Sequence, residues 1–393
     1  MKIKRVLLSV GLLISAAYAQ KHVEYYQPQK GDDVIGSIMY VTPNKHESLV
    51  DLTIRYEMGY DELRWANPGV NAWMLSDQQP IVLPLQFILP EGKRSGLVSN
   101  IPEMRTYYFL KGSDKVYVYP VGVGRMDWKT PLGSWSITRK QENPAWYPPE
   151  SIRREHVEMG RGTLPSVVPA GPDNPLGTRV LRLALPSYLL HGTNDQTGIG
   201  MRVTHGCMRF YPQHIEHLYD MVPTNTMVTF LNEPVKYGFL GNDLYIEVHP
   251  PLEEDELSTA DLKEKALVLL ENYLKNYPEA QVNYDMVNLA VQQQTGIPAI
   301  VGQKEAYKTA VYDETPGIEL YSAPDAVKEA VKTSTPSAAA KQTQGTTLKS
   351  RFDAPVIKEE IRLTPHPDTI VVPEVETEEE VIFPEPSSSR YNR

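Results

Sequence analysis

Short β-type segments separated by glycine and proline fill the middle of this chain, from Leu97 to Leu231. Aromatic and β-branched residues favour pleated, half-buried strands, whereas glycine and proline end them. Segments of this kind are residues 106–110, 115–119, 134–138, 179–183 and 227–230. The pattern predicts a mainly β domain, either a β-sandwich or a barrel-like fold. The tetrapeptides T-P-L-G at residues 130–133 and N-P-L-G at 174–177 are interpreted as turns between strands.

Residues 1–19 have the organisation of an export signal. A basic start is followed by an apolar run at residues 6–16 and by Ala17-Tyr18-Ala19, so we expect cleavage before Gln20. The apolar run is shorter than the roughly 20 residues that cross a bilayer, which disfavours a membrane anchor. We expect the mature protein to be exported without a membrane span. The net charge of the full sequence, -10, disfavours nucleic acid or an anionic membrane as the main partner, because both require a basic surface.

Cys207 is the only cysteine among the 393 residues. In an oxidising compartment it has no intramolecular disulfide partner, so it is a buried apolar side chain, an intermolecular link or a reactive thiol. Two histidines, His191 and His205, lie near it in the sequence. They favour the reactive thiol, because generating a thiolate near neutral pH takes a neighbouring base or positive charge.

The local pattern around the cysteine suggests how a reaction centre could be built. If residues 203–207 are extended, His205 and Cys207 share one face of the strand. Gly206 has no side chain, so a substrate carbonyl could approach the amides of Gly206 and Cys207 as an oxyanion hole. Spacing alone leaves open which histidine is the base. It also leaves open a zinc site, in which the thiolate and imidazole ligands would come from His191, His205, Cys207, His214 and His217. We expect His214 and His217 to be solvated helix residues.

The segment before the β-rich region predicts a small helical module at residues 45–91. Apolar spacing indicates a helix at residues 47–56 and a second at 60–69, stopped at Asn67-Pro68, with strand pieces at 81–84 and 87–90. The pattern L-x-x-x-Y-x-x-G-x-x-x-L-x-x-A-N-P-G, which begins at Leu52, resembles a LysM domain, a βααβ module that binds glycan strands of peptidoglycan. The same residues would also pack a helical hairpin with a purely structural role.

The segments after the cysteine are predicted to be helical and then disordered. A helix should begin at Pro212 and present Ile215, Leu218 and Val222 on one face. The extension at residues 233–332 is expected to be partly helical. One helix should begin at the capping box of Ser258, with Leu262, Ala266, Leu269 and Tyr273 spaced along it, and another should span residues 282–293. Residues 333–393 are rich in Ser, Thr, Pro, Ala and charge, which predicts a disordered tail.

Several ordered motifs together resemble the L,D-transpeptidase (YkuD) catalytic domain. They are V-G-V-G-R at residues 121–125, T-P-L-G at 130–133, V-P-A-G-P-D-N-P-L-G at 168–177, H-G-T at 191–193 and T-H-G-C-M-R at 204–209. With the export signal and the LysM-like module ahead of them, the chain resembles periplasmic L,D-transpeptidases of the ErfK/YbiS type. The resemblance implies a β-rich catalytic domain at residues 97–232, with a β-sandwich fold.

The resemblance also implies a role for each motif residue. Cys207 would be the nucleophile, and His191 the general base, oriented by the backbone carbonyl of Gly192. His205 would support the site by hydrogen bonding and by favouring the thiolate, and the Gly206 amide would bind the oxyanion. Arg209, Thr193 and Thr204 are substrate-binding candidates, although Arg209 fits equally well as a buried residue that holds the loop. The family requires no metal and no cofactor.

The implied chemistry is acyl transfer on peptidoglycan. The cysteine would attack the bond before the terminal D-alanine of a tetrapeptide stem, release D-alanine and hold the stem as a thioester. An amine would then accept the stem, giving a 3-3 cross-link or attachment of an outer-membrane lipoprotein. Water as acceptor would make the enzyme a carboxypeptidase or hydrolase. The competing interpretation is a non-catalytic wall-binding scaffold with an inert cysteine.

Overall fold

The computed structural model describes residue 23 and residues 25–92 and 94–305. The predicted export signal at residues 1–19 and the predicted disordered tail at 333–393 lie outside the described residues, as does the end of the predicted extension, from residue 306. All described residues belong to one structural unit, residues 1–311. In this part of the chain, no helix combines the length and the apolar character that crossing a bilayer requires.

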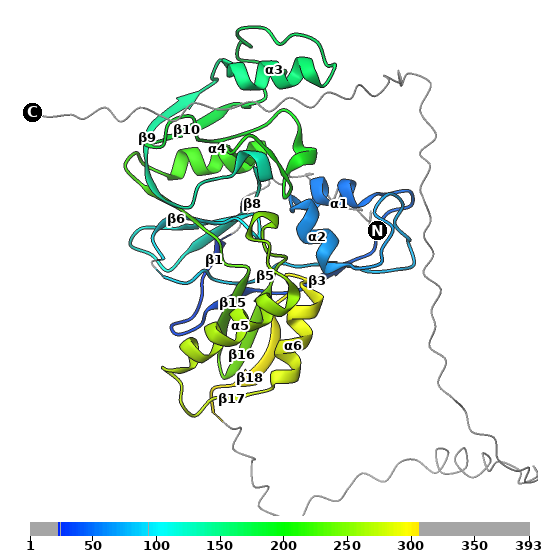
Figure 1. The fold of residues 1–393 in the computed structure, drawn as a ribbon, viewed down its shortest axis with the longest axis vertical. Helices are drawn as coiled ribbons and strands as arrows, with labels where there is room; N and C mark the ends of the chain where they lie inside the picture. Colours follow the sequence, from blue (N-terminus) through cyan, green and yellow to red (C-terminus); the bar gives the residue numbers. More distant parts are fainter. Residues whose placement is uncertain (1–22, 24, 93, 306–393) are drawn as a thin grey trace, which may run out of the picture. The chain divides into compact units, whose positions relative to one another are not determined.

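A ten-stranded sheet forms the centre of the described structure (Figure 1). The strand order is β1-β8-β13-β11-β10-β9-β14-β6-β7, with β12 paired to β8. Because β7 also pairs with β8, the path returns to its start and closes. The strands are β1 (Tyr25–Tyr26), β6 (Gly96–Asn100), β7 (Arg105–Phe109), β8 (Val116–Gly124), β9 (Gly133–Glu142), β10 (Arg179–Leu183), β11 (Leu189–His191), β12 (Arg202–Thr204), β13 (Met208–Phe210) and β14 (Met227–Leu231).

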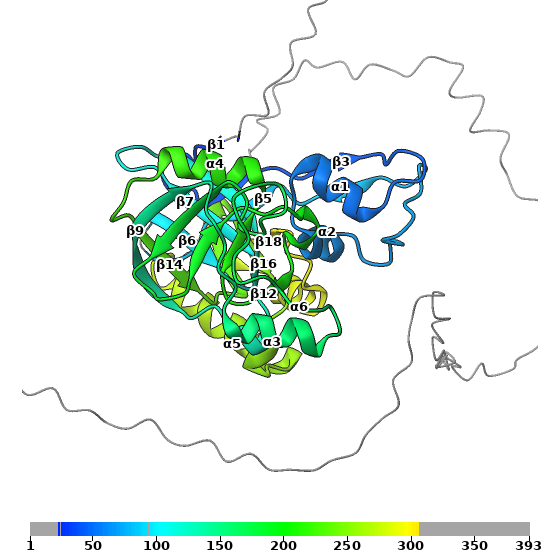
Figure 2. The same ribbon diagram turned by 90° about the horizontal axis from the view of Figure 1, so that it is seen from above.

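The two longest strands, β8 and β9, each belong to both halves of this sheet. One half contains β6, β7 and β14, and the other contains β10, β11 and β13. β8 pairs with β7 through residues 116–120 and then with β13 through Val121 and Gly122. β9 pairs with β14 through residues 133–136 and with β10 through residues that follow. Figure 2 shows β6, β7, β9 and β14 side by side in one of the halves. The predicted β-type segments fall on β7, β8, β9, β10 and β14, so the prediction of a mainly β fold is confirmed.

Apolar side chains from both halves and from one helix fill the space inside the sheet. Helix α4 (Pro212–Met221) begins with proline in its first turn, as predicted, and buries Ile215 and Leu218, with Val222 just after its end. These side chains pack with Leu181, Met208 and Phe210 of β10 and β13. The helix thereby supports the strands that flank His191 and Cys207.

A small βααβ unit precedes the main sheet. Helix α1 (Leu49–Tyr56) begins at a capping box formed by Ser48 and Asp51, and α2 (Tyr60–Ala66) ends just before Asn67. Strands β3 (Met39–Val41) and β4 (Ile81–Leu83) pair around them, while β2 (Val34–Gly36) pairs with β5 (Gln86–Ile88). Asn67 fixes the unit, because its amide bonds the backbone of both Leu63 and Val82. β3 precedes residue 45, where we expected the module to begin.

This βααβ unit is bonded to the segment that leads into the cysteine motif. The first amides of α2, from Tyr60 and Asp61, donate to the carbonyl oxygens of Ile199 and Gly200 at 3.0 Å each. The Tyr211 hydroxyl, just after β13, donates toward the carbonyls of Thr53 and Met58. The unit therefore holds the chain on both sides of Cys207, at residues 199–200 and at Tyr211.

The C-terminal extension contains a sheet that we did not predict. Strands β15 (Val235–Leu240), β16 (Asp243–Val248), β18 (Ala299–Gln303) and β17 (Gln281–Val282) form a four-stranded sheet, in that order. Helices α5 (Thr259–Leu274) and α6 (Tyr284–Gln293) pack on it through Leu262, Ala266, Leu270, Val287 and Val291. Both helices are close to their predicted positions, and the four-stranded sheet is an addition to the partly helical extension that we expected. β15 and β16 form a tight hairpin closed by Gly241 and Asn242.

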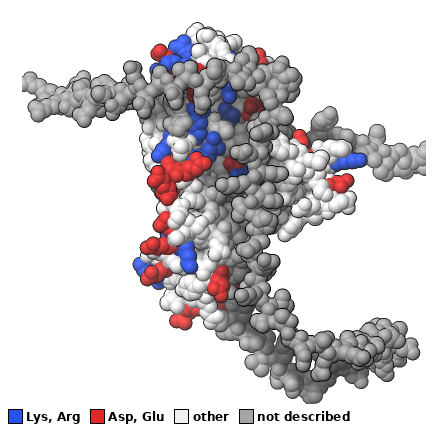
Figure 3. Space-filling model, turned by 45° about the vertical axis from the view of Figure 1, so that its right-hand side comes forward, with Lys and Arg blue, Asp and Glu red and all other residues white. Residues whose placement is uncertain are grey.

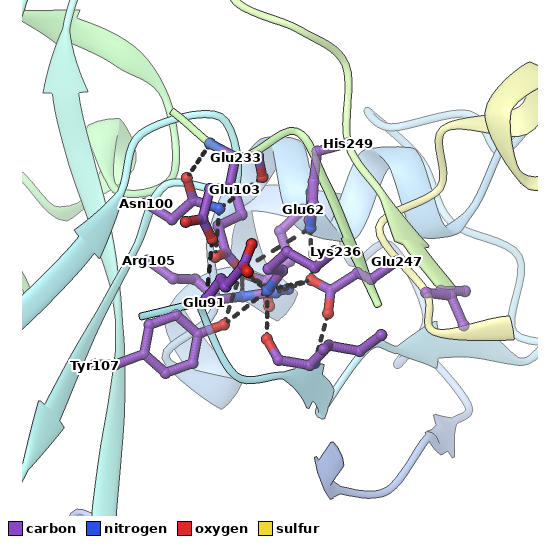
Figure 4. Close-up of polar contacts among 12 residues, drawn as sticks. Glu62, Glu91, Asn100, Glu103, Arg105, Tyr107, Glu233, Lys236, Glu247 and His249 are labelled. Carbon is purple, nitrogen blue, oxygen red and sulfur yellow. Dashed lines mark hydrogen bonds and ion pairs between the residues drawn. The ribbon is translucent and has the colours of Figure 1, made fainter. Parts of the chain in front are cut away.

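A buried network of charged side chains joins the three regions (Figure 4). The Lys236 ammonium of β15 lies 2.9 Å from Glu103 and 3.2 Å from Glu247 of β16. Arg105 of β7 contacts the same two carboxylates and also Glu62 of α2, each at 3.2 Å. Because the attraction of the cations outweighs burial, the pKa of Glu247 is lowered to about 2. The network therefore holds the βααβ unit, the main sheet and the extension together.

Candidate active site

His191 is the last residue of strand β11, which lies between β10 and β13 in the sheet. β11 pairs with β10 on one side and, in parallel, with β13 on the other, where His191 is the register partner of Arg209. The N-P-L-G turn at residues 174–177 packs closely against Gly192 and Thr193. Gly177 adopts φ +65, and a side-chain carbon there would lie 2.7 Å from the Thr193 amide. This tetrapeptide is thus both a turn, as predicted, and a close support for H-G-T.

Residues 205–207 form a turn between β12 and β13. The predicted extended stretch is wrong beyond Thr204, where β12 ends, so His205 and Cys207 do not share a strand face. Gly206 adopts φ +96, which favours glycine, and an added side-chain carbon would lie 2.7 Å from the Tyr188 ring. The Thr204 hydroxyl donates to the carbonyl of Cys207 at 2.5 Å. The turn is therefore fixed in part by its own backbone and by the Thr204 hydroxyl.

The T-P-L-G segment also contributes to this turn. The Thr130 hydroxyl donates to the Gly206 carbonyl at 3.0 Å and accepts from the Gly124 amide. Thr130 is buried, so its hydroxyl forms a persistent link between the end of β8 and the cysteine turn.

His191, Cys207 and Arg209 line one cleft with a volume of about 450 Å³. Its walls come from the end of β11, the cysteine turn, β13 and the segment between β9 and β10. The other lining residues are Trp128, Ala145, Trp146, Tyr147, Pro149, Ser151, Ile152, Pro175, Leu176, Arg182, Ser187, Leu189, Thr204 and His205. The structure thus brings the candidate nucleophile and the candidate base to a single concave surface.

The geometry of His191 fixes its tautomer. Its Nδ1 lies 2.6 Å from the carbonyl oxygen of Gly192, and a carbonyl oxygen only accepts, so the Nδ1–H must donate. Burial, with a further contribution from the positive charge of Arg209, lowers the pKa of His191 to about 4. The imidazole is therefore neutral at pH 7, and its Nε2 carries the lone pair that a base needs.

The Cys207 thiol is also uncharged at neutral pH. Burial raises its pKa to about 11, although a backbone hydrogen bond from Leu189 and the charges of Arg182 and Arg209 act in the opposite direction. Its Sγ lies 3.5 Å from the carbonyl oxygen of Ser187, to which the thiol donates. Burial of the sulfur thus outweighs the effect of the nearby cations, so a neighbouring base must take the proton to generate the thiolate.

His205 points to a carboxylate. Its Nε2 lies 2.5 Å from Oε2 of Glu155, and its ring packs edge-on against Trp128, with 5.3 Å between centroids. Glu155 belongs to helix α3 (Glu150–Glu158) in the segment between β9 and β10. The charges that lower the pKa of Cys207 come from the two arginines, so the thiolate-favouring role of His205 stays a prediction.

The three substrate-binding candidates differ in their surroundings. Arg209 faces the cleft, and its buried Nε has no hydrogen-bond partner among the described residues. Thr204 lines the cleft, but its hydroxyl is engaged by Cys207. Thr193 lies outside the cleft lining, is buried, and donates its hydroxyl to the carbonyl of Asp195 at 2.7 Å. Of the three, only Arg209 presents an unused donor.

Comparison with known proteins supplies the family. The model of the YkuD family, the L,D-transpeptidase catalytic domain, matches residues 94–230. "Probable L,D-transpeptidase ErfK/SrfK" of Escherichia coli K12 is 34% identical over 298 residues, which cover 75% of this chain and 95% of that relative. "Probable L,D-transpeptidase YbiS" of the same strain is 33% identical over 303 residues, with 76% and 98% covered. The chain belongs to the L,D-transpeptidase family.

Two solved L,D-transpeptidases are similar to this chain at lower sequence identity. The catalytic domain of the Enterococcus faecium L,D-transpeptidase, solved by NMR, has a TM-score of 0.28 and 16% identity, covering 36% of this chain and 100% of that domain. An L,D-transpeptidase from Mycobacterium smegmatis has a TM-score of 0.27 and 16% identity, covering 37% of this chain and 62% of that chain.

In this L,D-transpeptidase His214 is buried, contrary to our prediction, whereas His217 is half-buried. His214 is buried and its Nε2 lies 3.0 Å from Glu57, at the end of α1. Nδ1 of His217 lies 2.9 Å from the Tyr119 hydroxyl. The prediction failed because it considered only the apolar face of α4, whereas Glu57 after α1 and Tyr119 of β8 contact the two histidines outside that face.

The alternative zinc site needs side chains that this L,D-transpeptidase engages separately. His205 contacts Glu155, His214 contacts Glu57, and His191 contacts the Gly192 carbonyl. Within the described residues, a metal-compatible cluster forms only in the buried network, from Glu103, Glu247 and His249. There the Lys236 ammonium already contacts both carboxylates and occupies the position that a metal ion would take.

Sequence reasoning missed two charged residues of the site, Arg182 and Glu155. Arg182 reaches the cleft from β10, where its guanidinium is held by the side-chain oxygen of Gln141. The R-V-L-R-L strand pattern places Arg182 three residues from Arg179, hence on the opposite face, and this was a usable signal. Glu155 had no such signal, since α3 buries no residue and shows no apolar stripe.

Proposed function

We propose that this L,D-transpeptidase acts in the periplasm, where Cys207 takes up a peptidoglycan tetrapeptide stem as a thioester and passes it to an amine. The observation that carries the proposal is the shared cleft of Cys207 and His191, in which the Gly192 carbonyl leaves Nε2 of the imidazole free. Family membership supplies the reaction class, and the cleft supplies a nucleophile with a neutral base.

The first half-reaction releases D-alanine. His191 Nε2 takes the thiol proton as the Cys207 sulfur attacks the carbonyl carbon before the terminal D-alanine, and the amides of Gly206 and Cys207 bind the oxyanion. When the tetrahedral intermediate collapses, the peptide C–N bond breaks and the imidazolium gives its proton to the departing amine. The stem is then held on sulfur as a thioester, and His191 is neutral again.

The second half-reaction restores the thiol. An acceptor amine attacks the thioester carbonyl while His191 removes its proton, and the imidazolium returns that proton to the leaving sulfur. A stem side-chain amine would give a 3-3 cross-link, and a lysine of an outer-membrane lipoprotein would give an anchor. Water in the same position would give hydrolysis, the activity of a carboxypeptidase.

Because Cys207 and His191 are both neutral in the free enzyme, the thiol proton must move to the imidazole as the sulfur attacks the carbonyl carbon. Burial disfavours both charged forms, raising the pKa of Cys207 to about 11 and lowering that of His191 to about 4. A preformed thiolate–imidazolium pair is therefore scarce in the free enzyme. We infer that the bound stem itself promotes proton transfer, because its polarised carbonyl accepts the developing charge.

Two arginines suit the anionic stem. Arg182 and Arg209 both face the cleft that holds Cys207, and a tetrapeptide stem ends in a carboxylate. A guanidinium binds a carboxylate through paired donors, and Arg209 has a buried Nε–H without a partner among the described residues. We assign the stem carboxylates to these two side chains.

The βααβ unit is proposed to bind glycan strands. It exposes aromatic side chains, with Trp73 81% and Tyr40 68% accessible, and such rings suit the flat faces of sugars. Replacing Trp73 by Ala should weaken co-sedimentation with sacculi while leaving turnover of a soluble tetrapeptide unchanged. Equal sacculus binding by both forms would instead favour a purely structural unit.

The acceptor is decided by product analysis. The mature protein is incubated with purified sacculi, with and without added outer-membrane lipoprotein, and the muropeptides are identified by mass spectrometry. Dimers linked between third residues indicate cross-linking, lipoprotein-bearing stems indicate anchoring, and tripeptides alone indicate trimming. The Cys207→Ser variant should bind sacculi and yield none of these products; full sacculus binding with no product from either form would favour the scaffold.

A further inference from the structure

The segment between β9 and β10, residues 143–178, forms one wall of the cleft. Trp146, Tyr147 and Ile152 from this segment line the cleft beside Cys207. Its base is closed by Asn174, whose side-chain amide donates to the carbonyls of Pro144 and Pro169. Helix α3 lies beyond the ends of β9 and β10 (Figure 1), and its Ser151 and Ile152 line the cleft, so its position beside the cleft needs a further anchor.

Glu155 of α3 supplies that anchor. One carboxylate oxygen, Oε2, lies 2.5 Å from Nε2 of His205 in the cysteine turn. The other oxygen, Oε1, is bonded by the guanidinium of Arg125, just after β8. All three side chains are partly shielded from water, with exposures of 18% for Glu155, 27% for His205 and 28% for Arg125.

The two partners of Glu155 belong to the framework of the cysteine turn. Arg125 donates its backbone amide to the carbonyl of Thr204, and the 3-10 turn that follows carries Trp128, whose ring packs on His205. His205 is itself two residues from Cys207. A single carboxylate thus connects the wall segment to both supports of the nucleophile.

Glu155 does not face the reacting atoms. It is absent from the residues that line the cleft, and both of its oxygens are occupied by protein partners. The hydrogen bond from His205 and the charge of Arg125 favour the ionised form and hold the pKa of Glu155 below its usual range, despite the opposing effect of burial. A role as general acid is therefore excluded by geometry.

We propose that Glu155 is a positioning residue, which ties the wall segment of residues 143–178 to the cysteine turn through His205 and Arg125. In this arrangement His205 serves as an anchor for the wall. The wall in turn shapes the part of the cleft that holds the stem peptide. The kinetic part of this inference rests on the proposed function, whereas the structural part does not.

The test uses the full mature chain and three variants: Glu155→Gln, Glu155→Ala and, as a charge-matched control at the exposed end of the same helix, Glu158→Gln. Three quantities are measured: kcat and KM for release of D-alanine from a tetrapeptide, the alkylation rate of Cys207 by iodoacetamide, and tryptic cleavage after Arg161, a bond that none of the three substitutions adjoins. The midpoint of thermal unfolding is recorded alongside, to separate a loosened wall from a destabilised fold.

Loss of one charge-assisted link should lower kcat/KM about tenfold for Glu155→Gln, mainly through KM, and further for Glu155→Ala. Tryptic cleavage of the wall segment should accelerate by about tenfold, whereas Glu158→Gln should behave as wild type. Alkylation by the small reagent should not slow, because the thiol itself is untouched. Combining Glu155→Gln with His205→Asn should accelerate cleavage no more than either change alone.

Unchanged cleavage in Glu155→Gln, or additive effects on cleavage in the double variant, would overturn the proposal. So would an alkylation rate that falls in parallel with kcat/KM, since that would assign Glu155 to thiol activation. If the wild-type protein releases no D-alanine, the proposed function fails, and the cleavage measurements alone then decide the role of Glu155.

Discussion

His191 and Arg209 are register partners on the adjacent parallel strands β11 and β13. Side chains at paired positions lie on the same face of a sheet, which brings a permanent cation beside the imidazole. The charge of Arg209 adds to the effect of burial and lowers the pKa of His191. The sheet therefore keeps the base unprotonated.

The pH profile of Arg209→Gln tests this relationship. In the wild type, kcat/KM should fall only as the pH drops toward about 4, where His191 becomes protonated and can no longer accept the thiol proton. Removing the cation favours the imidazolium, so the pKa of His191 rises and the acidic limb moves to higher pH. Arg179→Gln, on the other face of β10, should leave the limb in place; an unmoved limb in Arg209→Gln would contradict the coupling.

Alkylation of Cys207 should be slow below neutrality. Because burial raises the thiol pKa to about 11, the reactive thiolate fraction should increase about tenfold per pH unit up to that value. The rate is followed with iodoacetamide by intact-protein mass. A rate that already levels off below pH 8 would show that the free enzyme holds a preformed thiolate.

Arg182→Gln should raise KM for the tetrapeptide by about tenfold, because one charged hydrogen bond to the stem carboxylate is lost. The pKa of Cys207 should rise as well, since Arg182 favours the thiolate. Arg179→Gln is the matched control on the same strand. A stem whose terminal carboxylate is amidated should bind wild type and Arg182→Gln equally well, and a retained difference would argue against carboxylate recognition.

Lys236→Met should destabilise the fold by about 3–5 kcal/mol, because Glu103 and Glu247 would lose a buried counter-charge. Chemical denaturation at pH 7 measures the change, with the exposed Lys263→Met of α5 as control. A loss below about 1 kcal/mol would show that water reaches the network and screens it.

The sequence revealed the parts of the site that lie within one motif. Cys207 and Gly206 belong to one motif, T-H-G-C-M-R, and could be proposed from it. His191 belongs to the separate H-G-T motif, and only the family resemblance favoured it over His205 as the base. The alternation of β10 could assign Arg182 to a strand face, but only strand pairing brings it to the cleft. Glu155 could not be placed, since it lies on a helix without an apolar stripe and contacts the cysteine turn through His205. Alternating residues around the Gly241-Asn242 turn indicate the β15–β16 hairpin, but only the helical periodicity that follows was used for the prediction. His214 was misplaced because its partner, Glu57, comes from the separate βααβ unit.

The central claim, acylation of Cys207 by a stem peptide, is tested most directly by intact-protein mass spectrometry. Mixing the mature protein with a tetrapeptide stem and quenching in acid should reveal an adduct with the mass of the stem less D-alanine. Peptide mapping should locate the adduct on Cys207, and Cys207→Ser should show no thioester. Release of D-alanine by Cys207→Ser at the wild-type rate would contradict the account.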